Sequence, residues 1–350
     1  MNQFRIHQRV IESGQPTYVI AEISANHNQN FDNTVALIEA AKHAGADAIK
    51  LQTYTADTLT IDCDRSHFQI SHGTAWDGQT LHQLYSQAAM PWDWQPKLKA
   101  IAESLGMDLF SSPFDGSAVD FLESMDVGAY KIASFEIVDT GLLAKVAQTG
   151  KPVIVSTGLA TEEDIHIAVA TLRKNGCQQI CLLKCTSSYP APPESMNLKT
   201  IGVMQTAFDV ETVGLSDHTR CNHAAIAAVA LGASVIEKHI TLDRSAGGPD
   251  SSFSLEPHEF ADMVTAVRTT EKAMGRVCFG PTEFDSANLA FRRSLFAVKD
   301  IKSGEPFSAK NVRSIRPGQG IPPKHLPDLI NRRAANEIPR GTPISWLDVA

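Results

Sequence analysis

The amino-acid sequence predicts an α/β fold, a (β/α)8 TIM barrel followed by a small C-terminal β-rich domain. Eight short β-rich runs alternate with helix-like segments from Tyr18 to about residue 275, which is close to the roughly 250 residues of such a barrel. Polar or ionisable residues close each of these runs. No G-x-G-x-x-G motif follows the first run, so a doubly wound dinucleotide-binding sheet explains the pattern less economically.

The predicted strands are short and rich in aliphatic and β-branched residues. In chain order they read YVIAEIS from Tyr18, DAIKLQTY from Asp47, MDLFSSPF from Met107, AYKIAS from Ala129, PVIVSTG from Pro152, QICLLKCTS from Gln179, TVGLSDHT from Thr212 and SVIEKHITL from Ser234. Apolar residues at helical spacing predict helices within 33–46, 118–125, 141–150, 162–176 and 222–233. Several of these segments carry a glycine that can close the last helical turn.

The pattern changes after about Arg276, and we place the domain boundary between residues 280 and 281. Residues 1–280 would form the barrel, and 281–350 a linker and a small β-rich domain with turns at Gly304, Gly318 and Gly341 and one short helix at 325–330. A module this small buries little surface. We therefore expect it to pack against a barrel, its own or a partner's.

Composition points to a soluble protein that acts on small molecules. The net charge is −8, which disfavours nucleic-acid binding. The longest apolar run, residues 224–236, is too short to span a membrane. The first residues lack a secretion signal, so we expect a cytoplasmic protein. Six cysteines are too few for a disulfide framework, and Cys177, Cys181 and Cys185 fit buried core thiols better than a metal cluster.

The ends of the predicted strands are the candidate site. Barrel enzymes place their catalytic groups at the carboxyl ends of the strands, and burying Lys or Glu there costs several kcal/mol unless the group is paired. We therefore expect a functional cleft built from Glu22, Lys50, Gln52, Ser111, Ser112, Lys131, Ser134, Ser156, Thr157, Lys184, Thr186, Ser216, His218, Glu237 and His239.

Individual residues within this set leave alternatives open. His218 and His239 end neighbouring strands, about 4.8 Å apart, so they could share an exchangeable ion such as Mn²⁺, or either could form a hydrogen bond or act as a general acid. Lys50 and Lys131 suit a phosphate or carboxylate, although a Schiff-base lysine is the alternative. Asp250, in the RSAGGPDSSFS loop, could hold sugar hydroxyls or simply cap a turn.

Eight ordered motifs carry a family resemblance: AEISANHN, AIKLQTY, SSPFD, YKIAS, STG, LSDHT, EKHIT and GGPD. In this order and spacing they resemble the sialic acid synthase family of phosphoenolpyruvate-condensing enzymes. The tail from about Asn288, with RPGQG, resembles that family's antifreeze-like (SAF) domain. Three segments, 67–94, 247–257 and 340–346, resemble its pseudaminic acid synthase branch more than its N-acetylneuraminate or legionaminate branches, which remain the alternatives.

The resemblance implies a reaction and a homodimer. Phosphoenolpyruvate would condense with an open-chain acylamino sugar, 2,4-diacetamido-2,4,6-trideoxy-L-altrose in the pseudaminic branch, to give a nine-carbon 2-keto acid and phosphate. The implied cofactor is a divalent ion, with Mn²⁺ favoured over Mg²⁺ or Co²⁺, and its ligands would be His218 and His239. Arg316 would reach the active site of the neighbouring subunit.

The resemblance also implies a role for each remaining residue of the site. Glu22 and Gln52 would position substrate and water, with Glu22 a candidate acid or base. Tyr189, Glu237 and Asp250 would contact the sugar. Phosphoenolpyruvate would be bound by Lys50, Lys131, Ser134, Ser156, Ser216 and a hydroxyl of Ser111 or Ser112.

Two positions depart from the sialic branch. Ser187 replaces the Asn of CTNxYP, and Ser112 replaces the Thr of STPF. The Ser187 change alters a phosphate contact, for which Lys184 could compensate.

Two other readings of the chain stay open. The antifreeze-like tail allows a non-catalytic carbohydrate-binding protein, and the barrel allows a metal-dependent aldolase that uses pyruvate. In the aromatic segment, Trp76, Trp92 and Trp94 form either a lid over a 6-deoxy sugar or, as we prefer, a hydrophobic support for the barrel rim.

Overall fold

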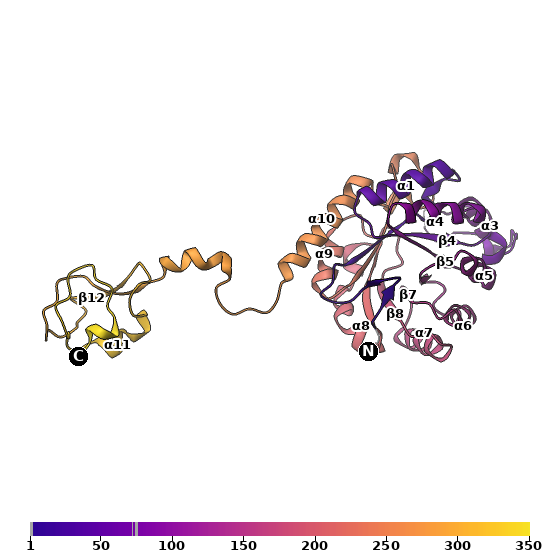
Figure 1. Ribbon diagram of the computed structural model, residues 1–350. Helices are drawn as coiled ribbons and strands as arrows, with labels where there is room; N and C mark the ends of the chain where they lie inside the picture. Colours follow the sequence, from indigo (N-terminus) through magenta and orange to yellow (C-terminus); the bar gives the residue numbers. More distant parts are fainter. Residues whose placement is uncertain (1–2, 72, 74–75) are drawn as a thin grey trace. The chain divides into compact units, whose positions relative to one another are not determined.

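The first compact unit of the chain is a closed barrel of parallel strands (Figure 1). The computed structural model describes residues 3–71, 73 and 76–350. Strand order around the barrel is β10-β3-β4-β5-β6-β7-β8-β9, so the predicted TIM barrel is confirmed. Each predicted run contains one strand: β3 (Tyr18–Glu22), β4 (Ala48–Thr53), β5 (Asp108–Pro113), β6 (Tyr130–Ile132), β7 (Val153–Ser156), β8 (Ile180–Cys185), β9 (Thr212–Asp217) and β10 (Val235–His239).

Helices surround these strands (Figure 1). Those in the predicted segments are α1 (Phe31–His43), α5 (Gly116–Ser124), α6 (Thr140–Gln148), α7 (Glu162–Lys174) and α9 (His223–Ala230). Side chains of Asn30, Asp115, Asp139 and Thr161 accept hydrogen bonds from backbone N–H groups of the first turns of α1, α5, α6 and α7, which satisfies donors that a helix start leaves free. Further helices that were not predicted from the sequence are α2 (Ala56–Leu59), α3 (Leu81–Ala88), α4 (Gln95–Ser104), α8 (Ile201–Phe208) and α10 (Pro257–Met274).

An N-terminal hairpin lies at the amino ends of the barrel strands. It pairs β1 (Arg5–Ile6) with β2 (Arg9–Val10), and Phe4, Ile6 and Ile11 join the barrel core. The backbone N–H of Arg5 donates to Gln179, just before β8, at 2.7 Å. Because the hairpin covers this end, a substrate has access to the barrel from the opposite end, where the carboxyl ends of the strands lie.

A buried ion pair links the carboxyl ends of β9 and β10. Lys238 Nζ lies 2.7 Å from Asp217 Oδ2, and both side chains are 0% exposed. The ammonium also donates to the carbonyl of Thr219. Asp217 accepts a 2.8 Å hydrogen bond from the Thr219 N–H. His218 lies between Asp217 and Thr219 in sequence, and His239 follows Lys238, so this contact fixes the backbone on which both histidines are carried.

The second compact unit is Arg276–Ala350, and the first ends at Gly275, whereas the sequence analysis places the boundary after residue 280. It contains an antiparallel pair, β11 (Ser294–Ala297) with β12 (Val312–Ile315). The helix expected at 325–330 is α11 (Leu326–Leu329). This unit has its own small core, which includes Leu295, Ile301, Phe307, Val312, Ile338 and Ile344. Within the described part of the chain, no helix combines the length and apolarity needed to cross a membrane.

Candidate active site

A cavity of about 360 Å³ opens at the carboxyl ends of the barrel strands. Pairs of residues two apart on one strand face it together, such as Lys50 with Gln52 and Glu237 with His239, because alternate side chains of a strand share a face. The predicted site residues that line it are Lys50, Gln52, Lys131, Ser134, Ser156, Tyr189, Ser216, His218, Glu237, His239 and Asp250.

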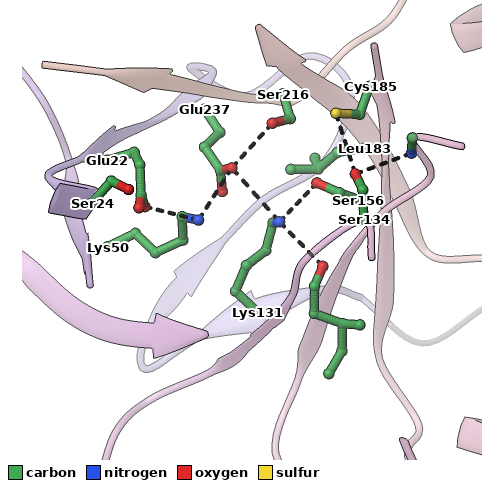
Figure 2. Close-up of polar contacts among 12 residues, drawn as sticks. Glu22, Ser24, Lys50, Lys131, Ser134, Ser156, Leu183, Cys185, Ser216 and Glu237 are labelled. Atoms are coloured by element: carbon green, nitrogen blue, oxygen red, sulfur yellow. Dashed lines mark hydrogen bonds and ion pairs between the residues drawn. The ribbon is translucent and has the colours of Figure 1, made fainter. Parts of the chain in front are cut away.

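Two lysines and two carboxylates form a buried cluster in this cavity (Figure 2). Lys50 Nζ lies 2.8 Å from Glu22 Oε2 and 3.4 Å from Glu237 Oε1. Lys131 Nζ lies 3.6 Å from the same Glu237 oxygen and donates to Ser156 Oγ at 2.7 Å. Ser216 donates to Glu237 at 3.1 Å. Glu237 therefore joins both ammonium groups.

Burial and charge act differently on the two carboxylates of this cluster. Burial raises the pKa of Glu22 to about 7, although Lys50 opposes the shift. Burial also acts to raise the pKa of Glu237, but Lys131 and Lys50 outweigh it and lower this pKa below its ordinary value. Near neutral pH the cluster thus contains one firmly ionised carboxylate and one poised to take up a proton.

Hydroxyl groups surround the Lys131 side of the cavity. Ser134 Oγ accepts a 3.2 Å hydrogen bond from the Gly158 N–H, and a Cβ at residue 158 would collide with the hydroxyls of Ser134 and Ser187. Glycine at this position therefore lets both serines approach the backbone of the STG motif. Together with Lys131 and Ser156, these donors form a site suited to an anion.

His218 and His239 fit a divalent ion. Their ring centroids lie 5.2 Å apart. His218 Nδ1 lies 3.0 Å from the Thr186 carbonyl oxygen, which leaves Nε2 as the ligating nitrogen. His239 Nδ1 is buried and lacks a partner among the described residues, and burial, together with His218, lowers the pKa of His239 well below its usual value. A neutral imidazole is the form that binds metal.

Other protein ligands for such an ion are few. The described residues contain no group of three or more His, Cys, Asp or Glu arranged to hold a metal. Water and substrate would therefore complete the coordination of an ion held by His218 and His239, as in sites that exchange ligands during catalysis.

A second polar network connects Gln52 to the loop after β10. Gln52 Nε2 donates to Glu22 at 3.1 Å and to Ser24 Oγ at 2.8 Å. Ser24 donates to Asp250, which also accepts from the Ala25 N–H at 3.3 Å. Asp250 is therefore held against the end of β3 while it lines the cavity.

Aromatic rings complete the cavity, and the three tryptophans of the aromatic segment differ in what they contact. Tyr189 lies 4.5 Å from the His218 ring and 6.1 Å from Trp76, between ring centroids. Trp76 lines the cavity and donates to the Pro249 carbonyl at 3.1 Å. Trp92 and Trp94 instead pack on Phe121 and Phe31, with centroids 4.8 and 5.6 Å apart. The support role thus describes Trp92 and Trp94, whereas Trp76 belongs to the cavity wall.

Several predicted site residues do not line the cavity. Ser111 Oγ lies 2.6 Å from Thr53 Oγ1, which donates in turn to Gln95 of α4, so Ser111 faces the helices. The Lys184 ammonium donates to the Cys185 carbonyl at 2.9 Å. Because strand residues alternate, Cys185 takes the cavity position that the sequence analysis gives to Lys184.

Four further predicted residues lie near the cavity or away from it. Ser112 Oγ is buried without a partner among the described residues. Ser187 lies beside Gly158, and Glu22 lies behind Lys50, fully buried. Arg316 belongs to the second unit and is exposed.

Glu136 and Cys185 line the cavity but were not predicted as site residues. Glu136 lies two positions after the predicted site residue Ser134 in KIASFEI, and this spacing was the sequence signal that could have identified it. Its Oε2 is buried without a partner among the described residues, and burial raises its pKa to about 7. Cys185, interpreted from sequence as a core thiol, lies 3.4 Å from Ser134 Oγ.

Comparison with known proteins identifies the family to which this chain belongs. Residues 37–278 match the NeuB family, and residues 292–350 match the SAF domain. The chain belongs to the NeuB family. The resemblance drawn from the ordered motifs, and the SAF domain inferred from the tail, are thereby confirmed.

Individual relatives of this NeuB-family chain match it over nearly its whole length. A pseudaminic acid synthase of Campylobacter jejuni subsp. jejuni serotype O:2 is 46% identical over 324 residues, 93% of this chain and 94% of that protein. A pseudaminic acid synthase of Helicobacter pylori is 40% identical over 337 residues, 96% of this chain and 98% of that protein. A crystal structure of N-acetylneuraminic acid synthetase from Leptospira borgpetersenii, in complex with citrate, superimposes with a TM-score of 0.73 at 28% identity, covering 82% of this chain and 95% of that one.

Proposed function

We propose that this NeuB-family protein is a pseudaminic acid synthase. It condenses phosphoenolpyruvate with 2,4-diacetamido-2,4,6-trideoxy-L-altrose to give pseudaminic acid and inorganic phosphate. The observation that carries the proposal is the buried cluster of Lys50, Lys131 and Glu237 beside the histidine pair. The two relatives that are 46% and 40% identical, both named pseudaminic acid synthases, support this choice of sugar.

The reaction forms one C–C bond and breaks one C–O bond. Carbon 3 of the enol attacks the sugar aldehyde, whose oxygen takes up a proton, and positive charge develops at carbon 2. Water adds at carbon 2 and loses a proton, and the resulting tetrahedral intermediate expels phosphate. A lysine Schiff base is not needed, since phosphoenolpyruvate is already an enol, so the lysines are free to bind anions.

Lys50 and Lys131 would bind the phosphate and carboxylate of phosphoenolpyruvate, assisted by the hydroxyls of Ser134, Ser156 and Ser216. Lys50 also stabilises the ionised form of Glu22, because its Nζ lies 2.8 Å from Glu22 Oε2. An anionic substrate on Lys50 weakens that stabilisation, so the pKa of Glu22, already raised to about 7 by burial, rises further. Glu22 would then be protonated and, since it does not itself line the cavity, could pass its proton to the developing alkoxide through one water molecule.

Carboxylates on the other side of the cavity would hold the attacking water. Glu237 has an Oε2 with no hydrogen-bond partner among the described residues, and so has Glu136. An ionised Glu237 would also stabilise positive charge at carbon 2. Gln52 and Asp250 would orient the sugar hydroxyls, and Tyr189 would pack against the sugar.

His218 and His239 would hold a divalent ion, for which we propose Mn²⁺. When bound, such an ion polarises a carbonyl oxygen and orients water. The role of this chain is to supply two imidazoles, of which that of His218 is oriented through Nδ1 by the Thr186 carbonyl.

We also propose that the protein works in the cytoplasm as a homodimer in which Arg316 reaches the neighbouring subunit's cavity. Phosphoenolpyruvate is produced in the cytoplasm, and Arg316 is exposed. A guanidinium matches a carboxylate with two parallel hydrogen bonds, which suits the carboxylate of the substrate or product.

One assay tests the proposed function. Purified protein is mixed with phosphoenolpyruvate and, separately, with the diacetamido altrose, the legionaminate precursor and N-acetylmannosamine, and phosphate and the nonulosonic acid are measured. We expect both products with the diacetamido altrose, their loss after chelation and their return with Mn²⁺. Activity on N-acetylmannosamine alone, or with pyruvate in place of phosphoenolpyruvate, would contradict the proposal.

A further inference from the structure

One wall of the cavity comes from the long connection between β4 and α4. Connections of this kind usually contain 2–6 residues, but this one runs from residue 54 to residue 94 and carries α2, α3 and short 3-10 turns. Long connections in compact barrels are usually functional. Large apolar side chains of this connection line the cavity together with Phe114, the residue after β5. We call this set the apolar wall: Leu59, Ile70, Trp76, Leu81, Leu84 and Phe114.

Charge is distributed unevenly around the cavity. Among the described lining residues, Lys50, Lys131, Glu136, Glu237 and Asp250 come from the barrel strands and the loops after β6 and β10. Residues 54–94 contribute no Lys, Arg, Asp or Glu to the lining of the described cavity. The cavity therefore combines an ionic part, suited to phosphoenolpyruvate, with a mostly apolar part that also includes His67.

The connection also lines the cavity with polar side chains, Tyr54, His67, Gln69, Trp76 and Tyr85, and some of these are already engaged. Gln69 donates its amide to the Asp64 carbonyl at 3.0 Å. Tyr54 is packed between the rings of Tyr85 and Phe114, with centroids 5.9 and 5.1 Å away. A buried hydroxyl without a partner is costly, whereas a methyl group is favoured in such surroundings.

We infer that the apolar wall selects the acylamino sugar at its carbon 6 and its acetamido methyl groups. It favours a C6 methyl over a C6 hydroxyl, and it disfavours a C6 phosphate, because the connection supplies no Lys or Arg among the described lining residues. This inference rests on the proposed function and deepens it, because it names residues outside the catalytic cluster that determine which sugar is used.

The size of the selection follows from the chemistry of the wall. An apolar pocket rejects a ligand that adds one hydroxyl by roughly 10- to 100-fold in kcat/KM. We expect that ratio between the 6-deoxy sugar and 2,4-diacetamido-2,4-dideoxy-altrose, which differs only at carbon 6. A polar side chain in the wall gives the hydroxyl a partner and should reduce the ratio by about tenfold.

The test compares wild type with Leu81→Gln and Leu84→Gln. For each protein, kcat/KM is measured with the 6-deoxy sugar and its 6-hydroxy analogue, and KM is measured for phosphoenolpyruvate. We expect the ratio to fall in both variants while KM for phosphoenolpyruvate changes by less than about threefold, because the ionic part of the cavity is untouched. Leu81 is only partly buried, so its variant remains informative if Leu84→Gln is unstable.

Leu231→Gln is the matched control. Leu231 follows α9, is 37% exposed and is not among the described lining residues, so its ratio should equal that of wild type. Equal use of both sugars by wild type, or an unchanged ratio in Leu81→Gln, would overturn the inference while leaving the proposed function intact. Absence of phosphate release with the 6-deoxy sugar would overturn both.

Discussion

Glu136 shows at the scale of one residue how burial links activity to stability. Its pKa is raised by burial to about 7 from an ordinary value of 4.5. The folded state therefore holds a proton that the unfolded state releases between pH 4.5 and 7, so ionisation of Glu136 lowers the free energy of unfolding as the pH rises through this window. A cavity that needs a carboxylate at this position has a corresponding cost in stability.

We predict that Glu136→Gln stabilises the fold at pH 8 and lowers activity. The amide removes the buried charge, so the free energy of unfolding should rise by about 1 to 3 kcal/mol at pH 8. The gain should nearly vanish at pH 4.5, where the folded wild type is protonated and the unfolded chain is half protonated. Urea unfolding at pH 4.5 and pH 8 measures it. Glu163→Gln, on the exposed start of α7, is the control, and a variant no more stable than wild type at pH 8 would contradict this account.

Single residues also show what the sequence predicts and what it does not. Polar strand ends indicated the end of the barrel at which the cavity lies, since Lys50, Lys131 and Glu237 converge there. The sequence does not say which of two adjacent polar residues faces inward, because a one-residue offset moves a side chain to the other face. Cys185 rather than Lys184 therefore lines the cavity.

At the scale of elements, regular periodicity predicted well and irregular segments did not. All eight barrel strands lie in the predicted runs, and α7 has the capping Thr161 that marks a helix start. Residues 54–94 lack a repeating pattern, because α2 and α3 are short and are joined by turns. Their packing depends on the barrel beneath them, and local propensity carries little information about such segments.

We predict that the Lys238–Asp217 ion pair, which links the ends of β9 and β10, positions His218 and His239. Replacing Lys238 by Met leaves the fully buried Asp217 carboxylate without its partner, which should cost about 3 to 5 kcal/mol of stability. It should also loosen the loop that carries His218, so affinity for Mn²⁺ falls. The double variant Lys238→Met/Asp217→Asn removes both charges, so no buried carboxylate is left unpaired. It should therefore recover part of the stability but not the affinity for Mn²⁺.

Calorimetric titration with Mn²⁺ and urea unfolding separate these two effects. Lys145→Met removes an exposed pair with Asp120, 2.7 Å apart, on α6 and α5, and should change neither quantity by much, because exposed ion pairs contribute little. If Lys238→Met binds Mn²⁺ as wild type does, the pair only stabilises the fold and does not position the histidines.

At the scale of the whole molecule, the chain is two compact units, Met1–Gly275 and Arg276–Ala350. The sequence indicated two domains from a change in composition. It contains no comparable signal for what the second unit contacts, because that depends on surfaces from separate parts of the chain.

Mixed dimers test the homodimer and the role of Arg316 together. Arg316→Ala should lower kcat/KM through loss of a substrate contact, and His239→Ala should lose activity through loss of a metal ligand. If Arg316 reaches the neighbouring cavity, mixing and re-annealing the two variants creates dimers with one complete site. Random pairing should then restore about a quarter of wild-type activity. Light scattering checks that dimers form. A chain that remains monomeric, or a mixture no more active than its components, would show that each cavity works with its own chain alone.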